Sequence, residues 1–270
     1  MVNFKDDVTA NEIMYRLTEI NKSIATTPSK RLNKPGWDDI FNQQSFKCQI
    51  TNGSLLFIGD SIVAGLSRYK SIWKRYFEKK NAINCGIGGD QTQHVLWRAS
   101  KMILPKNINH IVVHCGSNNL QHSSPEDIAS AIILIGVTLT ERCSNVKVLI
   151  TGILPRGYQW TNLRSKIHKT NYFIKMFTAR YDNLFFLENL QNWTLENGNL
   201  NRSYFYKDFI HLIEKGNENF AQSIDKMLSS SPFNSPIAKT ESNSKSLSPS
   251  LSAHIISSIS ATSSSSSTTS

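Results

Sequence analysis

The feature that most constrains the fold is a regular alternation of short apolar runs with longer stretches of helical periodicity. Apolar runs at residues 54–59, 82–85, 110–115, 146–150 and 184–187 predict five buried strands. Between and after them, apolar side chains recur at helical spacing in 62–76, 92–102, 125–139, 163–181 and 220–227. This order predicts an α/β protein, a three-layer α/β/α sandwich around a five-stranded parallel sheet with right-handed crossovers.

The two ends of the chain have a different character. Ile13, Leu17, Ile20 and Ile24 are spaced as in an amphipathic helix, and residues 26–36 read as a linker. The last 42 residues are nearly half serine, too polar to offset their ordering entropy, and are predicted to be disordered. We therefore expect an N-terminal helix and linker over 1–36, a globular domain over 37–228 and a disordered tail over 229–270.

No signal peptide and no membrane-spanning stretch is recognised in the sequence. The four cysteines are scattered without a C-x-x-C pair, which favours reduced thiols and a cytoplasmic location. The net charge is +10, and residues 51–228 hold 21 Lys and Arg against 13 Asp and Glu. This basic excess is either a solvated surface or a surface that attracts anionic lipid or nucleic acid.

Chemically useful residues follow the first three predicted strands, where the ligand site of a parallel sheet lies. The first is Gly59-Asp60-Ser61, which places a serine where the next helix begins and where free N–H groups suit a developing oxyanion. Gly86-Ile87-Gly88-Gly89-Asp90 follows the second strand and can bring backbone N–H groups close to a ligand. Asn118 follows the third strand and can donate its amide into the same crevice.

The fourth block is Asp208-Phe209-Ile210-His211, just before the last predicted helix. A serine nucleophile needs a base, and the base needs an orienting carboxylate. Taken singly, each block has a plainer interpretation: a helix cap for Ser61, a turn for the glycines and for Asn118. The glycine spacing fits neither the dinucleotide fingerprint nor the P-loop, so nucleotide binding is not predicted.

Together, these blocks resemble the four conserved blocks of the SGNH (GDSL-type) hydrolases, in the same order. The strings FIGDSIV (57–63), CGIGGDQTQHVLWR (85–98), GSNN (116–119), ILPRG (153–157) and DFIHL (208–212) are similar to the catalytic subunits of intracellular platelet-activating-factor acetylhydrolase. The similarity runs from about Trp37 to Leu228 and leaves out the N-terminal helix and the tail.

The resemblance implies a flavodoxin-like fold and a serine esterase. Ser61 would be the nucleophile, His211 the base and Asp208 its orienting acid, and the N–H groups of Ser61 and Gly89 with the Asn118 amide would hold the oxyanion. No metal and no cofactor are implied. The expected substrate is a small-acyl, acetyl-type ester, an acetylated phospholipid being one form, and the resembling enzymes act as dimers.

Three alternatives stay open at this point. One is an acetylesterase for carbohydrate or another alcohol, because this fold hosts many substrates. The second is a non-catalytic RNA- or membrane-binding module on the same fold, which the intact set of four blocks disfavours. The third is an esterase module derived from a larger mobile-element protein.

Overall fold

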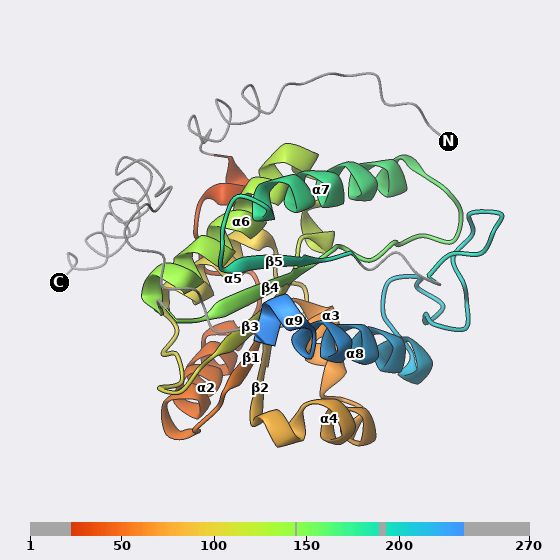
Figure 1. Cartoon of the computed structure of the whole chain (residues 1–270). Coiled ribbons are helices and arrows are strands. Elements are labelled where there is room, and N and C mark those ends of the chain that lie inside the picture. The colour runs from red at the N-terminus through yellow and green to blue at the C-terminus, as the bar shows by residue number, and fades with distance from the viewer. Residues whose placement is uncertain (1–22, 144, 189–192, 235–270) are drawn as a thin grey trace. The chain divides into compact units, whose positions relative to one another are not determined.

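The sheet has five parallel strands, as the alternation in the sequence predicts, and their order is β2-β1-β3-β4-β5 (Figure 1). The strands are β1 (Leu55–Gly59), β2 (Ala82–Gly86), β3 (His110–His114), β4 (Lys147–Thr151) and β5 (Leu184–Leu187). A computed structural model describes residues 23–143, 145–188 and 193–234. This strand order is the flavodoxin-like arrangement, in which ligands bind at the switch point between β1 and β3, where the order of adding strands to the sheet reverses.

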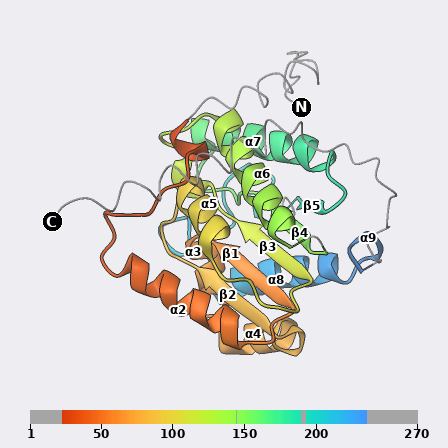
Figure 2. The ribbon, with the colours of Figure 1, turned by 90° about the vertical axis from the view of Figure 1, so that its left-hand side faces the viewer.

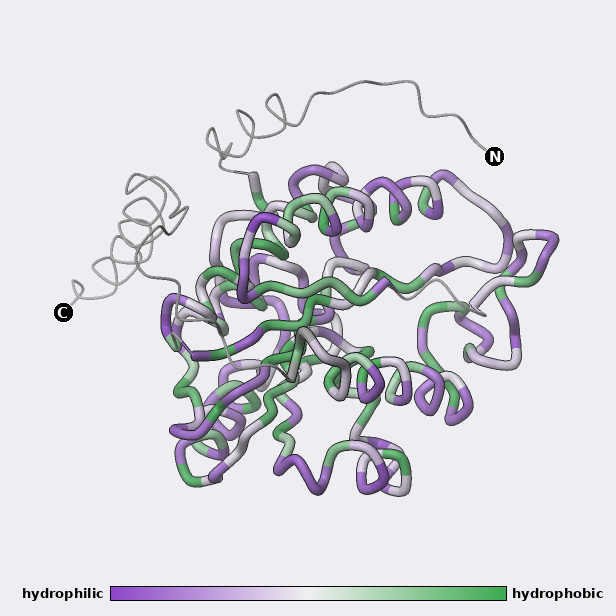
Figure 3. Tube along the Cα trace, in the orientation of Figure 1, coloured by the Kyte–Doolittle hydropathy of each residue, from purple (hydrophilic) through white to green (hydrophobic). Residues whose placement is uncertain are grey.

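Burial follows the position of each strand in the sheet. All residues of β1 and β4 are buried, and so are all but the first of β3, because helices cover both faces of these central strands. The edge strands β2 and β5 are only partly buried. Figure 3 shows the same contrast, with apolar strands inside and mixed hydropathy along the outer helices.

The helices form two layers (Figures 1 and 2). One contains α5 (Thr92–Lys101), α6 (Pro125–Arg142) and α7 (Asn162–Thr178), packed in that order. The other contains α3 (Ser61–Leu66), α4 (Lys70–Tyr76), α8 (Glu214–Leu228) and α9 (Ser231–Asn234). Short 3₁₀ turns, η1 (Ile24–Thr26), η2 (Glu78–Lys80) and η3 (Ser117–Asn119), complete the elements together with α2 (Trp37–Ile50).

Two helices differ from the sequence prediction. The single helix expected over 62–76 is divided into α3 and α4, with Tyr69 in an extended conformation between them. The carbonyl of Val63 accepts a hydrogen bond from Asn84 Nδ2 at 2.6 Å, which competes with continuation of the helix. Helix α2 was not predicted, although Phe41, Ser45 and Cys48 are buried at helical spacing along it and α2 packs against β2.

The ends of the domain also differ from the prediction. Residues 26–36, expected as a linker, lie against the domain together with the two residues before them: η1 packs on α5 and α6, and Thr92 Oγ1 donates to the carbonyl of Ala25 at 3.0 Å. Residues 229–234, expected to belong to the disordered tail, include α9, whose Phe233 is buried beside Phe185 of β5. Most of the predicted N-terminal helix and the tail beyond 234 lie outside the described residues.

Candidate active site

Ser61 is the first residue of α3 and follows β1 after a very tight turn. Gly59 lies so close to β3 that a Cβ atom there would overlap the carbonyl oxygen of His114, and Asp60 N–H donates to that same oxygen at 3.2 Å. The Asp60 side chain then caps the helix by accepting the N–H of Ile62 at 2.9 Å. As the first helical residue, Ser61 has a backbone N–H without an acceptor inside the helix.

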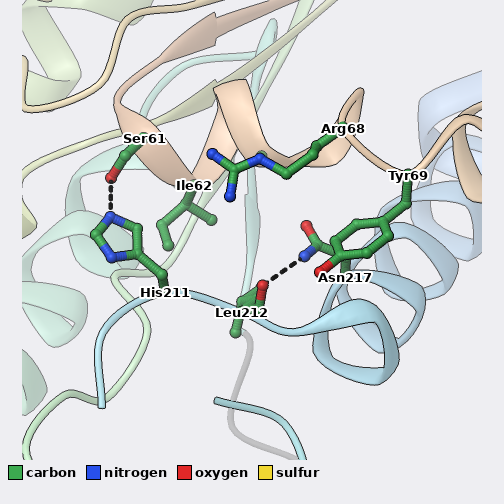
Figure 4. Close-up of a pocket in the computed structure, with 8 residues that line it drawn as sticks. Ser61, Ile62, Arg68, Tyr69, His211, Leu212 and Asn217 are labelled. Carbon is green, nitrogen blue, oxygen red and sulfur yellow. Dashed lines mark hydrogen bonds between the residues drawn. The ribbon is translucent and has the colours of Figure 1, made fainter. Parts of the chain in front are cut away.

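The imidazole of His211 lies between the hydroxyl of Ser61 and a carboxylate. His211 Nε2 is 3.0 Å from Ser61 Oγ, and His211 Nδ1 is 2.6 Å from Asp208 Oδ2. Figure 4 shows the hydroxyl and the imidazole facing each other among the residues that line a small pocket. The residues are 150 positions apart in the chain, so only the fold brings them together.

The Asp208 carboxylate is held in place by its own loop. Asp208 Oδ1 accepts the backbone N–H groups of Ile210 and His211 at 2.9 and 3.0 Å, while Oδ2 faces the imidazole. Desolvation raises the pKa of Asp208, but the hydrogen bonds from the His211 side chain, the His211 backbone and the Ile210 backbone together lower it below its usual value. The group is therefore a carboxylate at neutral pH and can orient the imidazole.

The loop from Asp208 to His211 contains a strained residue and is held by contacts with residues that follow β4. Phe209 has φ of 53°, a left-handed conformation that costs a residue with a Cβ about 1 kcal/mol or more. The carbonyl of Phe209 accepts the N–H of Gly157 at 3.0 Å, and its ring packs on Tyr158 at 5.2 Å. Sequence reasoning did not find this support, because its residues follow β4 and are distant from Asp208 in the chain.

Arg156 of the ILPRG string links two of the loops around the site. Its Nη1 donates to the backbone carbonyl of Ser117 at 3.0 Å and lies 3.3 Å from the Ser117 hydroxyl. Burial lowers the pKa of Arg156, and the nearby carboxyl groups of Asp208 and Asp60 oppose this effect. The contacts place Arg156 between the loops after β3 and β4, in accord with a packing role.

The three predicted oxyanion donors follow β1, β2 and β3, whose carboxyl ends lie at the same edge of the parallel sheet. Gly89 has φ of 81°, which favours glycine, and a Cβ on the preceding Gly88 would lie 3.8 Å from Ser61 Cβ. Asn118 Nδ2 donates to the carbonyl of Asp90 at 2.9 Å. An amide nitrogen carries two hydrogens, so this bond orients the group and leaves one hydrogen for a ligand.

A buried ion pair that the sequence did not reveal fixes the strand ends beneath the site. Arg98 Nε is 2.9 Å from Asp90 Oδ2, and both side chains are inaccessible to solvent. The other guanidinium nitrogens donate to the carbonyls of Cys85 and Gly59 at 2.6 and 2.7 Å. Burial raises the pKa of Asp90, but Arg98 opposes this shift. The only signal in the sequence is an arginine within the apolar stripe of a predicted helix.

Asp60 is the most perturbed carboxyl group of the site. Burial raises its pKa to about 7, and the capping hydrogen bond from Ile62 opposes this effect. Its Oδ2 atom is buried and has no hydrogen-bond partner among the residues that the structure describes. The group is close to its midpoint at neutral pH, unlike the ionised Asp208.

The pocket beside the serine is lined by Ser61, Ile62, Gly65, Arg68, Tyr69, His211, Leu212 and Asn217. Its enclosed part holds about one water-sized group. Within the described ranges, no group of three or more His, Cys, Asp and Glu side chains is arranged to hold a metal ion. None of the described helices has the length and apolar character needed to cross a bilayer.

The sequence model of the GDSL-like Lipase/Acylhydrolase family matches residues 57–218, which include every residue placed in the site above. The chain belongs to this family. As a GDSL-like hydrolase it is a carboxylic ester hydrolase with an α/β fold. The family predicted from the four blocks is thereby confirmed.

Two curated relatives are similar over most of their length. The human platelet-activating factor acetylhydrolase IB subunit alpha2 is 33% identical over 182 residues, which cover 67% of this GDSL-like hydrolase and 78% of the relative. The human alpha1 subunit is 31% identical over 203 residues, which cover 73% and 85%.

The solved structures agree on the fold. A putative platelet activating factor from Streptococcus pneumonia has a TM-score of 0.62 at 21% identity and covers 71% of this chain and 92% of its own. At this identity the likeness shows the shared fold alone, so the chemistry of the GDSL-like hydrolase must be argued from its own residues.

Proposed function

We propose that the chain is a serine esterase in which Ser61 attacks the ester carbonyl, His211 accepts the serine proton and Asp208 holds the imidazole. The alcohol leaves with the proton that His211 returns, and an acyl-enzyme on Ser61 Oγ remains. Water, deprotonated by His211, then attacks the acyl group and releases the acid. The observation that carries this proposal is the continuous hydrogen-bonded path from Ser61 Oγ through His211 to Asp208 Oδ2.

The developing oxyanion would be held by the N–H of Ser61, the N–H of Gly89 and the side-chain amide of Asn118. The first donor is supported by its place at the start of a helix, and the third by the bond that orients the Asn118 amide. One such donor typically contributes about 3 kcal/mol to the transition state.

The substrate proposed is an acetyl ester. The enclosed part of the pocket, which Ile62 and Leu212 help to line, has room for a group of about the size of a methyl. Arg68 borders this pocket, is exposed, and has no ion pair or hydrogen bond to another side chain in the described part of the chain. A free cation there favours an ester whose alcohol carries an anion, which supports an acetylated phospholipid over a neutral carbohydrate ester.

The phospholipid, the cytoplasmic location and a homodimer are parts of this proposal that rest on the resemblance to the acetylhydrolase subunits. A carbohydrate acetylesterase is the alternative within the same chemistry. A binding module for RNA or membranes is the alternative of another class, and it would not need the hydrogen-bonded path from Ser61 to Asp208.

The test combines active-site labelling with hydrolysis. The full chain is treated with a fluorophosphonate probe, and its rates on p-nitrophenyl acetate and butyrate are compared. We expect labelling and hydrolysis that Ser61→Ala abolishes, with acetate strongly preferred over butyrate. The matched control is Ser67→Ala, which removes an exposed hydroxyl at the end of the same helix. Labelling that persists in Ser61→Ala, or wild-type protein that neither reacts nor hydrolyses but retains RNA in low salt, would overturn the proposal.

A second comparison tests the substrate class. Acetate esters of a neutral alcohol and of a phosphate-bearing alcohol are compared in the wild type, Arg68→Lys and Arg68→Gln. We expect Arg68→Gln to raise KM for the phosphate ester alone, and Arg68→Lys to retain most of the affinity. An equal effect on both esters would remove the argument for an anionic substrate.

A further inference from the structure

Two cationic side chains donate to a single carbonyl oxygen next to the site. Arg31 Nη1 lies 2.9 Å and Lys34 Nζ lies 2.8 Å from the carbonyl oxygen of Gly88. Both cations come from residues 24–36, which precede α2 and lie outside the stretch that the family model matches. A carbonyl oxygen has two lone pairs, so these bonds use its full accepting capacity.

Because the peptide group is rigid, hydrogen bonds that fix the Gly88 carbonyl also fix the direction of the Gly89 N–H. The peptide between Gly88 and Gly89 is planar and trans, so its N–H points away from its C=O. Holding the oxygen towards Arg31 and Lys34 therefore turns the N–H of Gly89 to the opposite side. No acceptor for this N–H is found among the described residues. A Cβ on Gly89 would lie 2.5 Å from Arg31 Nη1, so the guanidinium occupies the side that a side chain would take.

The two cations also act on the strength of the N–H donor. Charged donors on a carbonyl polarise the whole amide, which makes its N–H a better donor. They also bring positive charge close to the place where an oxyanion would form. The cations repel each other, and desolvation together with Arg31 lowers the pKa of Lys34. The Asp90 carboxylate, 4.0 Å from Arg31 Nη1, offsets part of this repulsion.

We propose that Arg31 and Lys34 are positioning residues that hold and polarise the Gly88–Gly89 peptide, so that its N–H stabilises the oxyanion. This inference rests on the proposed role of Gly89 as an oxyanion donor. It gives residues 24–36, which precede the stretch that the family model matches, a role in supporting catalysis. The competing explanation is that the two cations only fasten residues 24–36 to the domain.

Steady-state kinetics of the full chain provide the first test. We expect Arg31→Ala and Lys34→Ala each to lower kcat about tenfold, and the double variant about a hundredfold, with little change in KM. Arg31→Lys and Lys34→Arg should recover most of the rate, since a cation can still reach the carbonyl. The matched control is Lys30→Ala, which removes a cation of the same segment that pairs with Asp38 at 3.0 Å.

A spectroscopic test reads the peptide itself, because Gly88-Gly89 is the only pair of consecutive glycines in the chain. In protein labelled with glycine carrying ¹³C in the carbonyl and ¹⁵N in the amide, an HNCO spectrum contains a single cross peak, from this peptide. We expect the carbonyl resonance to move upfield in Arg31→Ala and Lys34→Ala and to stay in place in Lys30→Ala. After reaction with a fluorophosphonate, the amide proton should move downfield in the wild type and less in the two variants.

The outcomes distinguish a failure of the inference about Arg31 and Lys34 from a failure of the proposed esterase function. Unchanged kcat in the double variant, or a cross peak that does not respond to it, would overturn the role of Arg31 and Lys34 while Ser61-dependent hydrolysis stands. An equal loss in Lys30→Ala, accompanied by a lower Tm, would show that the segment has only a structural role. Full activity of Ser61→Ala would instead contradict the proposed function, and the carbonyl shift would still report whether the cations hold the peptide.

Discussion

The replacement Asp208→Asn tests the orienting role of the carboxylate with little change in shape. In the structure, Oδ1 accepts two backbone N–H groups and Oδ2 faces His211 Nδ1 at 2.6 Å. Asparagine can keep its oxygen on the two backbone donors, which places its NH₂ group against Nδ1. The imidazole must then accept at Nδ1 and carry its proton on Nε2, where it faces the hydroxyl of Ser61 and cannot take a proton.

The expected magnitude follows from this wrong tautomer. In serine hydrolases with this arrangement of groups, such a change lowers kcat about 10⁴-fold, equivalent to about 5 kcal/mol in the activation free energy. Stability should change far less, because the Asp208 side chain is 44% exposed and its ion pair is screened by solvent. We expect the free energy of unfolding to fall by less than about 1 kcal/mol.

The assay measures kcat on p-nitrophenyl acetate together with urea unfolding of the same samples. Asp182→Asn, which changes an exposed acid before β5, serves as the control for loss of charge. A variant that keeps more than about a tenth of the wild-type kcat would refute the orienting role. A loss of activity matched by global unfolding would refute the claim that the loop keeps its shape.

Three further predictions concern residues around the site. The pKa of Asp60 is raised to about 7, so the folded protein binds the extra proton and loses stability as pH rises towards 7. We therefore expect the free energy of unfolding of Asp60→Asn, relative to that of the wild type, to increase by about 3 kcal/mol from pH 5 to pH 8. Unfolding titrations at several pH values measure this difference, and a difference that does not change with pH would contradict the prediction. Arg98→Met leaves the carboxylate of Asp90 buried and should cost about 4 kcal/mol in urea unfolding, of which the double change with Asp90→Asn recovers a large part. Gly89→Ala requires φ of 81° and a Cβ against Arg31, so kcat should fall at least about tenfold with KM nearly unchanged, and wild-type kcat would remove Gly89 from the site.

The sequence alone determined the class of fold. Five apolar runs of strand length, separated by stretches of helical period, require a parallel sheet covered on both faces, and each run became a strand. In the same order of elements, Ser61, Gly89 and Asn118 each follow one of three successive strands. Ligand sites in parallel sheets lie at the carboxyl ends of the strands, so the sequence predicted that these residues share one site. The sequence could reveal the strands and helices because apolar runs and helical periods are patterns that extend over only a few neighbouring residues.

Local patterns did not determine where helices break or which polar groups are buried. The separation of α3 from α4 accompanies a hydrogen bond between Asn84 and Val63, which the sheet brings together. Helix α2 was missed although its buried positions follow a helical period, because its polar residues outnumber them.

Only the tertiary structure decided how the site is held. The approach of His211 to Ser61, the burial of Arg98 with Asp90, and the two cations on Gly88 all join parts of the chain that are far apart in sequence or fixed by the sheet. Sequence spacing reports the period of an element and the order of the loops. It carries no record of the distances between those loops, because these arise from the packing of the layers.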